Sequence, residues 1–131
     1  MEKFENPKDL KYTKDHEWVR VEGNRAVIGI TDVAQSLLGD VVFVELPEVG
    51  AEFKAEESMS AIESVKAVSD VFAPISGKVV EINGELESSP DLINKDAFGE
   101  GWIVIVEMSD LSELDNLMTV EEYGKFAVGV E

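Results

Sequence analysis

The chain of 131 residues has the length of one domain with a core large enough to fold unaided. It holds 28 acidic and 11 basic residues, a formal net charge of −17, so nucleic acid and anionic membrane surfaces would repel it and a monomer is favoured. It has no cysteine and one histidine, His16, which excludes disulfides, thiolate metal sites and zinc sites with two histidines. We therefore predict no metal site and no catalytic residue, and any reactive group is expected to be borrowed.

No targeting or membrane segment is expected from the sequence. No apolar run approaches the roughly 18 residues of a transmembrane helix. The first ten residues, MEKFENPKDL, lack the apolar core of a signal peptide. These observations predict a cytoplasmic protein.

The first half of the chain predicts a hairpin followed by a short helix. Residues 18–31, WVRVEGNRAVIGIT, are typical of two strands joined by a glycine–asparagine turn. The segment TDVAQSLLGD predicts a helix near residues 32–38. Thr31 or Asp32 can cap its N-terminus, and Gly39 fits a left-handed position after its end.

Five further strands are predicted, each a short run of apolar and β-branched residues. Residues 84–100 lie between the last two and predict a polar loop. Many short strands at this spacing predict an all-β sandwich or barrel. The five segments are DVVFVELP (40–47), MSAIES (59–64), AVSDVFAP (67–74), KVVEIN (78–83) and GWIVIVEM (101–108).

The C-terminal segment changes from strand to helix spacing. SDLSELDNLM and TVEEYGKFAVG have helical periodicity, and Thr119 with Glu122 matches a capping box. The prediction is one domain over residues 1–131, with a core over 18–108 and a helical appendage over 109–131.

An internal repeat predicts two similar halves. TDVAQSLLGDVVFVEL (31–46) aligns with SDVFAPISGKVVEING (69–84) at an offset of 69 − 31 = 38, and SMSAIE (58–63) resembles WIVIVE (102–107) at an offset of 44. Such halves predict a pseudo-twofold arrangement of two sheets. At the second offset the counterpart of Lys66 is Asp110, so the lysine is not required by the scaffold.

Lys66, in AIESVKAVSD, is expected at a turn between two short strands. Its neighbours Val65 and Ala67 are apolar or small, which lets another protein approach closely. Acylation of such a lysine would make a long neutral arm. A Schiff-base lysine normally requires desolvation, which a protruding turn does not offer. An ordinary surface lysine is the plain alternative.

Five segments carry a resemblance to a known family. They are YTKDHEWV, AVIGITDVAQSLLGDVVFVELPEVG, SAIESVKAVSDVFAPISGKVVEIN, LINKDAFGEGWIVIV and EYGKF, which together cover about residues 11–126 in family order. The sequence closely resembles the H proteins of the glycine cleavage system, which are lipoyl carriers. The resemblance implies a lipoyl/biotinyl-type flattened β-sandwich, a barrel-sandwich hybrid. Because ESVKA resembles the lipoylation motif, it also implies lipoate bound covalently to Lys66.

The resemblance implies a carrier that is not an enzyme. It would shuttle an aminomethyl group and reducing equivalents between a pyridoxal-phosphate glycine decarboxylase, a tetrahydrofolate-dependent aminomethyltransferase and an FAD-containing dihydrolipoyl dehydrogenase, after loading by lipoylating enzymes. The missing cysteines fit this reading, because the thiols come with the cofactor. Strong acidity suits fast, transient docking on several enzymes.

The resemblance also implies that the loaded arm folds back near Glu17 and Asp70, the candidate sheltering carboxylates. Asp70 has a competing structural reading, because its repeat counterpart, Asp32, is a candidate helix cap or turn residue. His16 is expected to be packed or exposed without a catalytic role. Residues around the turn are candidates for recognition by lipoylating enzymes or partners, namely Glu63, Ser64, Val65 and Ala67.

Three alternatives share the predicted fold. A biotin carrier would usually have methionines flanking the lysine, and Lys66 has none. A lipoyl relay would pass lipoate to other lipoyl domains, and the sequence does not separate it from a glycine-cleavage carrier. An unmodified binding domain would not depend on the lysine at all.

Overall fold

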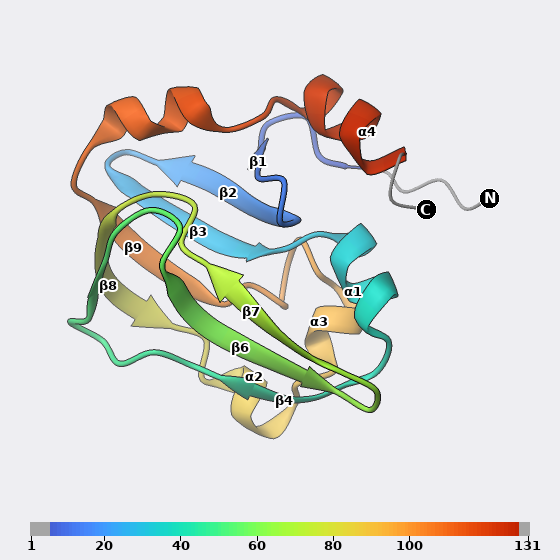
Figure 1. The fold of residues 1–131 in the computed structure, drawn as a ribbon. Helices are drawn as coiled ribbons and strands as arrows, with labels where there is room; N and C mark the ends of the chain where they lie inside the picture. The colour runs from blue at the N-terminus through green and yellow to red at the C-terminus, as the bar shows by residue number, and fades with distance from the viewer. Residues whose placement is uncertain (1–5, 129–131) are drawn as a thin grey trace.

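The computed structural model describes residues 6–128, and its strands form two antiparallel sheets packed as a sandwich (Figure 1). One sheet has six strands in the order β1-β2-β3-β9-β8-β5, and the other has three in the order β4-β6-β7. The predicted mainly-β sandwich is therefore confirmed. The strands are β1 (Lys11–Tyr12), β2 (Glu17–Glu22), β3 (Arg25–Ile30), β4 (Val41–Glu45), β5 (Glu52–Phe53), β6 (Ser58–Ser64), β7 (Val68–Phe72), β8 (Gly77–Ile82) and β9 (Val104–Met108).

Five helical segments accompany the sheets. Among the described residues, no helix is long and apolar enough to cross a bilayer. The segments are α1 (Asp32–Leu38), α2 (Glu85–Ser88), α3 (Leu92–Lys95), the 3₁₀ helix η1 (Leu111–Asn116) and α4 (Val120–Val128).

Both faces of the β2–β3 hairpin are buried along the first half of β2 and most of β3, which alternation in the sequence did not predict. Val19 and Ile28 belong to the core between the two sheets. Trp18 belongs to a second apolar cluster with Tyr12 and Tyr123, so β1 and α4 cover the outer face (Figure 1). The hairpin is therefore the shared wall of two apolar clusters.

The predicted helix caps are largely confirmed. The hydroxyl of Thr31 accepts the N–H of Ala34 at 3.2 Å and caps α1. Gly39 has the expected positive φ of 80°, but its ψ of −155° leads the chain towards β4 instead of into a left-handed helical turn. At α4, the N–H of Thr119 donates to the Glu122 carboxylate at 2.9 Å, and the N–H of Glu122 donates to the Thr119 hydroxyl at 3.3 Å.

The predicted polar loop over residues 84–100 is wrong, because this segment forms α2 and α3 and contributes to the core. Leu86 and Ile93 are fully buried. Asn94 donates to the Gln35 side chain and to the carbonyl of Gly39, both at 2.9 Å, which fastens α3 to the end of α1. Helices of four residues are too short for apolar periodicity to reveal them in a mostly polar segment.

The internal repeat is visible in the pairing of β4 and β8, with one corrected offset, whereas its first part aligns the helix α1 with the strand β7 and is not a structural repeat. The bulge in β4 begins after Val41, and the bulge in β8 comes 38 residues later, which is the offset of the sequence repeat. Val41 pairs with Ser64, and its repeat counterpart, Val79, pairs with Val106. The partner strands therefore differ by 106 − 64 = 42 residues rather than 44, so the Asp110 counterpart assigned to Lys66 is wrong by two residues.

Ile93→Ala should lower the free energy of unfolding by about 2–5 kcal/mol, because it opens a cavity at a fully buried site. Urea unfolding followed by circular dichroism measures the loss. Val49→Ala is the matched control, because Val49 is 61% exposed and should change stability by less than about 0.5 kcal/mol. Equal losses in both variants would contradict the role of α3 in the core.

Candidate functional site

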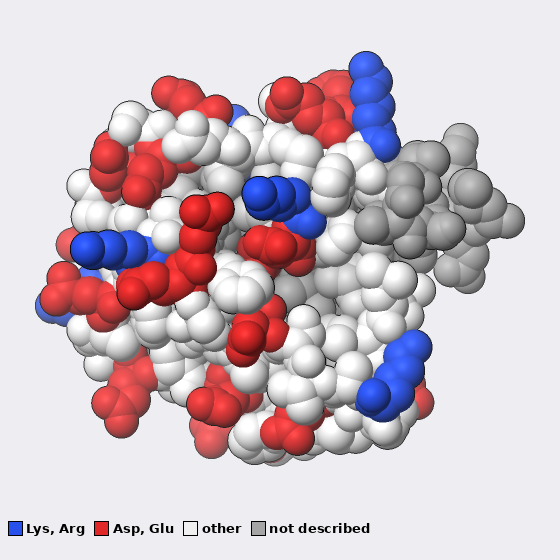
Figure 2. Space-filling view, in the orientation of Figure 1, with Lys and Arg blue, Asp and Glu red and all other residues white. Residues whose placement is uncertain are grey.

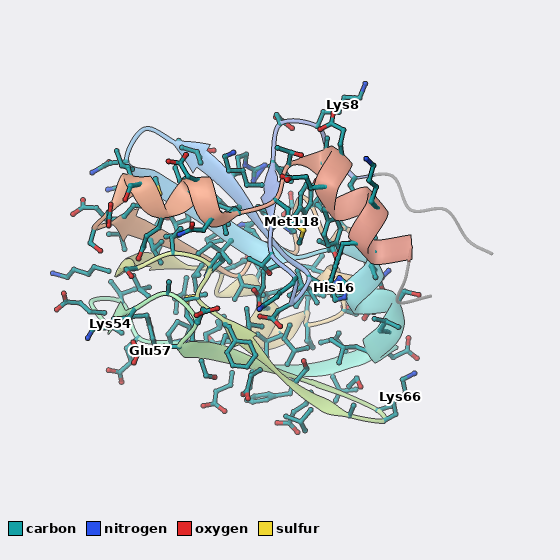
Figure 3. All side chains as sticks on the ribbon, turned by 45° about the horizontal axis from the view of Figure 1, so that its top comes forward. Lys8, His16, Lys54, Glu57, Lys66 and Met118 are labelled. Carbon is teal, nitrogen blue, oxygen red and sulfur yellow. The ribbon has the colours of Figure 1, made fainter. Side chains whose placement is uncertain are left out.

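Lys66 lies at the tip of the β6–β7 hairpin, in a turn built by one serine (Figure 3). The Ser64 hydroxyl accepts the N–H groups of Lys66 and Ala67 at 3.3 and 3.1 Å. The N–H of Ser64 donates to the carbonyl of Ala67 at 2.8 Å, and the N–H of Val65 donates to the carbonyl of Asp40 at 3.0 Å. The turn is therefore closed on itself and fastened to the segment that follows α1.

The side chain of Lys66 is exposed on this fixed base. Its flanking residues Val65 and Val68 are each 69% exposed, and Ala67 is exposed too. A Cβ added at Gly39 would lie 3.5 Å from Cε of Lys66, so the lysine stem runs past the end of α1. In Figure 3 the side chain projects from the outer end of the hairpin.

A cavity of about 150 Å³ lies between α1 and β7. Leu37 and Leu38 from α1 and Ile62 from β6 supply part of its apolar lining. Glu17 and Asp70, the two predicted carboxylates, both line it. The fold therefore brings together two residues 53 positions apart, beside the hairpin that carries Lys66.

Glu17 is only 2% exposed, and both of its carboxylate oxygens have donors. Thr13 donates its hydroxyl proton to Oε1 at 2.7 Å, and the N–H of Phe72 donates to Oε2 at 2.9 Å. Burial raises the pKa of Glu17 to about 7, although these two hydrogen bonds act in the opposite direction. The side chain thus bridges β2 of one sheet and β7 of the other.

Asp70 differs from Glu17 because its side chain is exposed. It lies within β7, where it pairs with Ala61 of β6. Thr31 is the N-cap of α1. The repeat suggested that Asp70, like Asp32, caps a helix or forms a turn. Asp70 instead lies in strand β7 and lines the cavity.

His16 packs against Tyr123 and Phe126 of the C-terminal helix and also lines the cavity. Its Nδ1 lies 2.7 Å from the hydroxyl of Tyr123, which also lies 2.7 Å from the hydroxyl of Thr31. Burial lowers the pKa of His16, which favours the neutral ring. Its φ of 66° is unusual for a residue other than glycine. Sequence reasoning missed Tyr123 because no local pattern links residues 107 positions apart.

Comparisons with known proteins identify the family. The model of the glycine cleavage H-protein family matches residues 10–129. The chain belongs to this family. It is 61% identical over 120 residues to the glycine cleavage system H protein of Symbiobacterium thermophilum, covering 92% of this chain and 94% of that relative. It is 57% identical over 117 residues to the H protein of Bacillus subtilis, covering 89% and 92% of the two chains.

The fold agrees with a solved member of the same family. The crystal structure of a glycine cleavage system H protein from Mycobacterium marinum matches with a TM-score of 0.84 and 42% identity, covering 92% of this chain and 97% of that one. H proteins are non-catalytic lipoyl carriers of glycine catabolism, so this chain is a carrier and not an enzyme. The family assignment favours a lipoyl carrier over a biotin carrier.

The surface of this H-protein family member is strongly acidic. The face drawn in Figure 2 carries many more acidic than basic side chains, in agreement with the net charge of −17. Such a field speeds encounters with basic partner surfaces and makes their rates sensitive to salt.

Glu17→Gln should change how stability depends on pH. An unfolded glutamate titrates near 4.5, whereas folded Glu17 titrates near 7, so between these values the folded protein holds a proton that the unfolded chain has lost. Glu17 therefore lowers stability as pH rises through this window. From pH 5 to pH 8 the free energy of unfolding of the variant should gain about 2–3 kcal/mol relative to the unaltered protein.

Urea unfolding of both proteins at both pH values measures how their difference in stability changes with pH. Any effect of the amide on geometry is the same at both pH values and cancels in this double difference. Glu45→Gln, at an exposed position, should leave the double difference within about 0.5 kcal/mol. A Glu17→Gln variant that behaves like this control would contradict the raised pKa.

Proposed function

We propose that Lys66 is the lipoyl attachment site and that the chain carries its load between the other proteins of the glycine cleavage system. The observation that carries the proposal is the turn, which holds an exposed lysine on a base closed by Ser64. The partners would be the pyridoxal-phosphate decarboxylase, the aminomethyltransferase and the FAD-containing dehydrogenase, with lipoylating enzymes acting first. A cytoplasmic location, a monomeric state and a single domain over residues 1–131 remain part of this proposal.

The residues present fit a lipoyl group. It would supply a dithiolane that carries an aminomethyl group and two electrons, chemistry that a chain without cysteine lacks. Measured from the lysine Cα, the lipoyl-lysine arm has about a dozen bonds. At the length per bond of an extended chain it spans about 14 Å. Asp70 is four residues beyond Lys66, at most about 13 Å at the rise of a strand. The cavity beside Asp70 is therefore within reach of the arm.

The two cavity carboxylates would have different tasks. Asp70 is exposed at the cavity, so it is available to a load that carries a positive charge. Glu17 already accepts two hydrogen bonds and holds the end of β7 through Phe72. We infer that Asp70 attracts the load directly, whereas Glu17 shelters it mainly by keeping β7 in place.

Lys66→Arg should abolish modification. The intact mass of protein from a lipoate-replete host should show one lipoyl increment, and the variant, which keeps the charge, should show none. A biotin increment would move the chain to the carboxylase carriers. No increment in a host that lipoylates other proteins would contradict the proposed attachment site.

Asp70→Asn should release the load faster, because it removes a charge that attracts a cationic amine. We expect at least a several-fold rise in the rate of ammonia release from the loaded carrier without tetrahydrofolate. Glu45→Gln is the control, because Glu45 lies in the same cross-strand row, across Ala61 from Asp70. Equal release from both variants would contradict the sheltering role of Asp70.

A further inference from the structure

Exposed apolar side chains gather around Lys66. Val42 and Phe43 of β4 are 53% and 49% exposed, and Val65 and Val68 beside the lysine are each 69% exposed. We call these four residues the tip patch. They are four of the nine large apolar side chains that are exposed in the described part of the chain, so nearly half of these side chains lie on or beside the β6–β7 hairpin.

Strand pairing places two residues of the tip patch, Phe43 and Val68, in one row across the three-stranded sheet. Phe43 pairs with Glu63, which in turn pairs with Val68, and all three side chains are exposed. Phe43 of β4 and Val68 of β7 therefore lie on either side of the Glu63 position. Residues far from Lys66 in sequence thus share its surface.

A bulge exposes two consecutive apolar side chains of β4. The register with β6 shifts between Val41 and Phe43, and the burial along the strand changes from buried Val41 to exposed Val42 and Phe43 and back to buried Val44. Regular alternation would turn one of the middle two inward, whereas a bulge re-aims a side chain. Two adjacent apolar side chains at the surface contribute little to the core and are available to contact another molecule.

The short reach of an unmodified lysine indicates which partner must contact the tip patch. From Cα to Nζ the side chain spans five bonds, about 6 Å when extended. An enzyme that acylates Nζ must enclose this group, so its surface has to rest on the residues around the turn. The other partners meet a lysine already extended by lipoate and do not need to approach as closely.

Acidic side chains surround the tip patch. Glu63 lies within the row, Glu45 and Asp70 belong to the next row, and Asp40 holds the turn. The hairpin end of the molecule in Figure 2 is white apart from one basic side chain, with acidic groups along the neighbouring edge. A surface of this kind is complementary to an apolar depression rimmed by Lys and Arg.

We propose that the tip patch is the docking surface of the enzyme that lipoylates Lys66, and that this enzyme presents an apolar depression with a basic rim. This inference rests on the proposed attachment at Lys66. In the reaction, Nζ attacks the carboxyl carbon of lipoyl adenylate, an amide bond forms, and AMP and a proton leave. Val42 and Phe43 thereby determine specificity without belonging to the sequence around the lysine.

The test is the rate of lipoylation with purified lipoylating enzyme, ATP, lipoate and unmodified full-length protein. Phe43→Ser and, separately, Val42→Ser should lower kcat/KM for the carrier at least tenfold, mainly through KM, because truncated apolar anchors weaken docking. Val49→Ser is the matched control, since it removes an exposed valine of the loop between β4 and β5 and should leave kcat/KM within twofold. Urea unfolding shows whether each variant is folded.

The outcomes separate the two proposals. If the unaltered protein is lipoylated and both β4 variants react as fast as Val49→Ser, the tip patch is not the docking surface. If the unaltered protein is not lipoylated, the attachment site itself is wrong and the docking proposal falls with it. Slower lipoylation of the folded β4 variants supports the tip patch as the docking surface. A kcat/KM that declines less steeply with added salt in Glu63→Gln than in the unaltered protein supports the basic rim.

Discussion

The buried carboxylate of Glu17 is the contact on which the geometry of the site depends. It joins the start of β2 to the end of β7, so it sets the six-stranded sheet against the strand that returns from Lys66. The Phe72 N–H would otherwise have to find another acceptor at the edge of the three-stranded sheet. Burying an acid is costly, and the raised pKa is the measure of that cost. This cost is incurred where the hydrogen bond from Phe72 to Glu17 joins the two sheets.

A second polar junction involves His16, which lines the cavity beside Glu17. The hydroxyl of Tyr123 contacts Thr31, which caps α1, and His16, which belongs to the turn before β2. The ring of Tyr123 also stacks on Tyr12 at a centroid distance of 4.6 Å. The C-terminal helix therefore supports the site from outside the cavity, because it ties α1 to the 15–17 turn.

These junctions explain how a carrier can be rigid and still offer its lysine freely. Lys66 is exposed, whereas every backbone contact of its turn points inwards, to Ser64 and to Asp40. A fixed turn lowers the entropy lost when an enzyme encloses the lysine. The cofactor supplies the reactive sulfur, so the chain itself contributes position, shelter and recognition.

Local features were predictable from the sequence because they depend on neighbours within a few residues. The longer strands, the Thr31 cap, the capping box at Thr119 and the turn at Lys66 all use such short-range chemistry. The sequence also determined the family, through motifs that run along most of the chain. The attachment of lipoate to Lys66 stays a prediction that the fold accommodates.

Tertiary structure alone decided the rest. The four-residue helices α2 and α3 exist because Leu86 and Ile93 find core contacts, not because of their own propensity. The cavity, the Tyr123 junction and the tip patch join residues between about 20 and 107 positions apart, and no local pattern records such distances. The sequence by itself determined the longer strands and the lysine. It did not reveal the two-residue strands β1 and β5, which form only by pairing with β2 and β8. Packing of the two sheets and the C-terminal helix decided what surrounds the lysine.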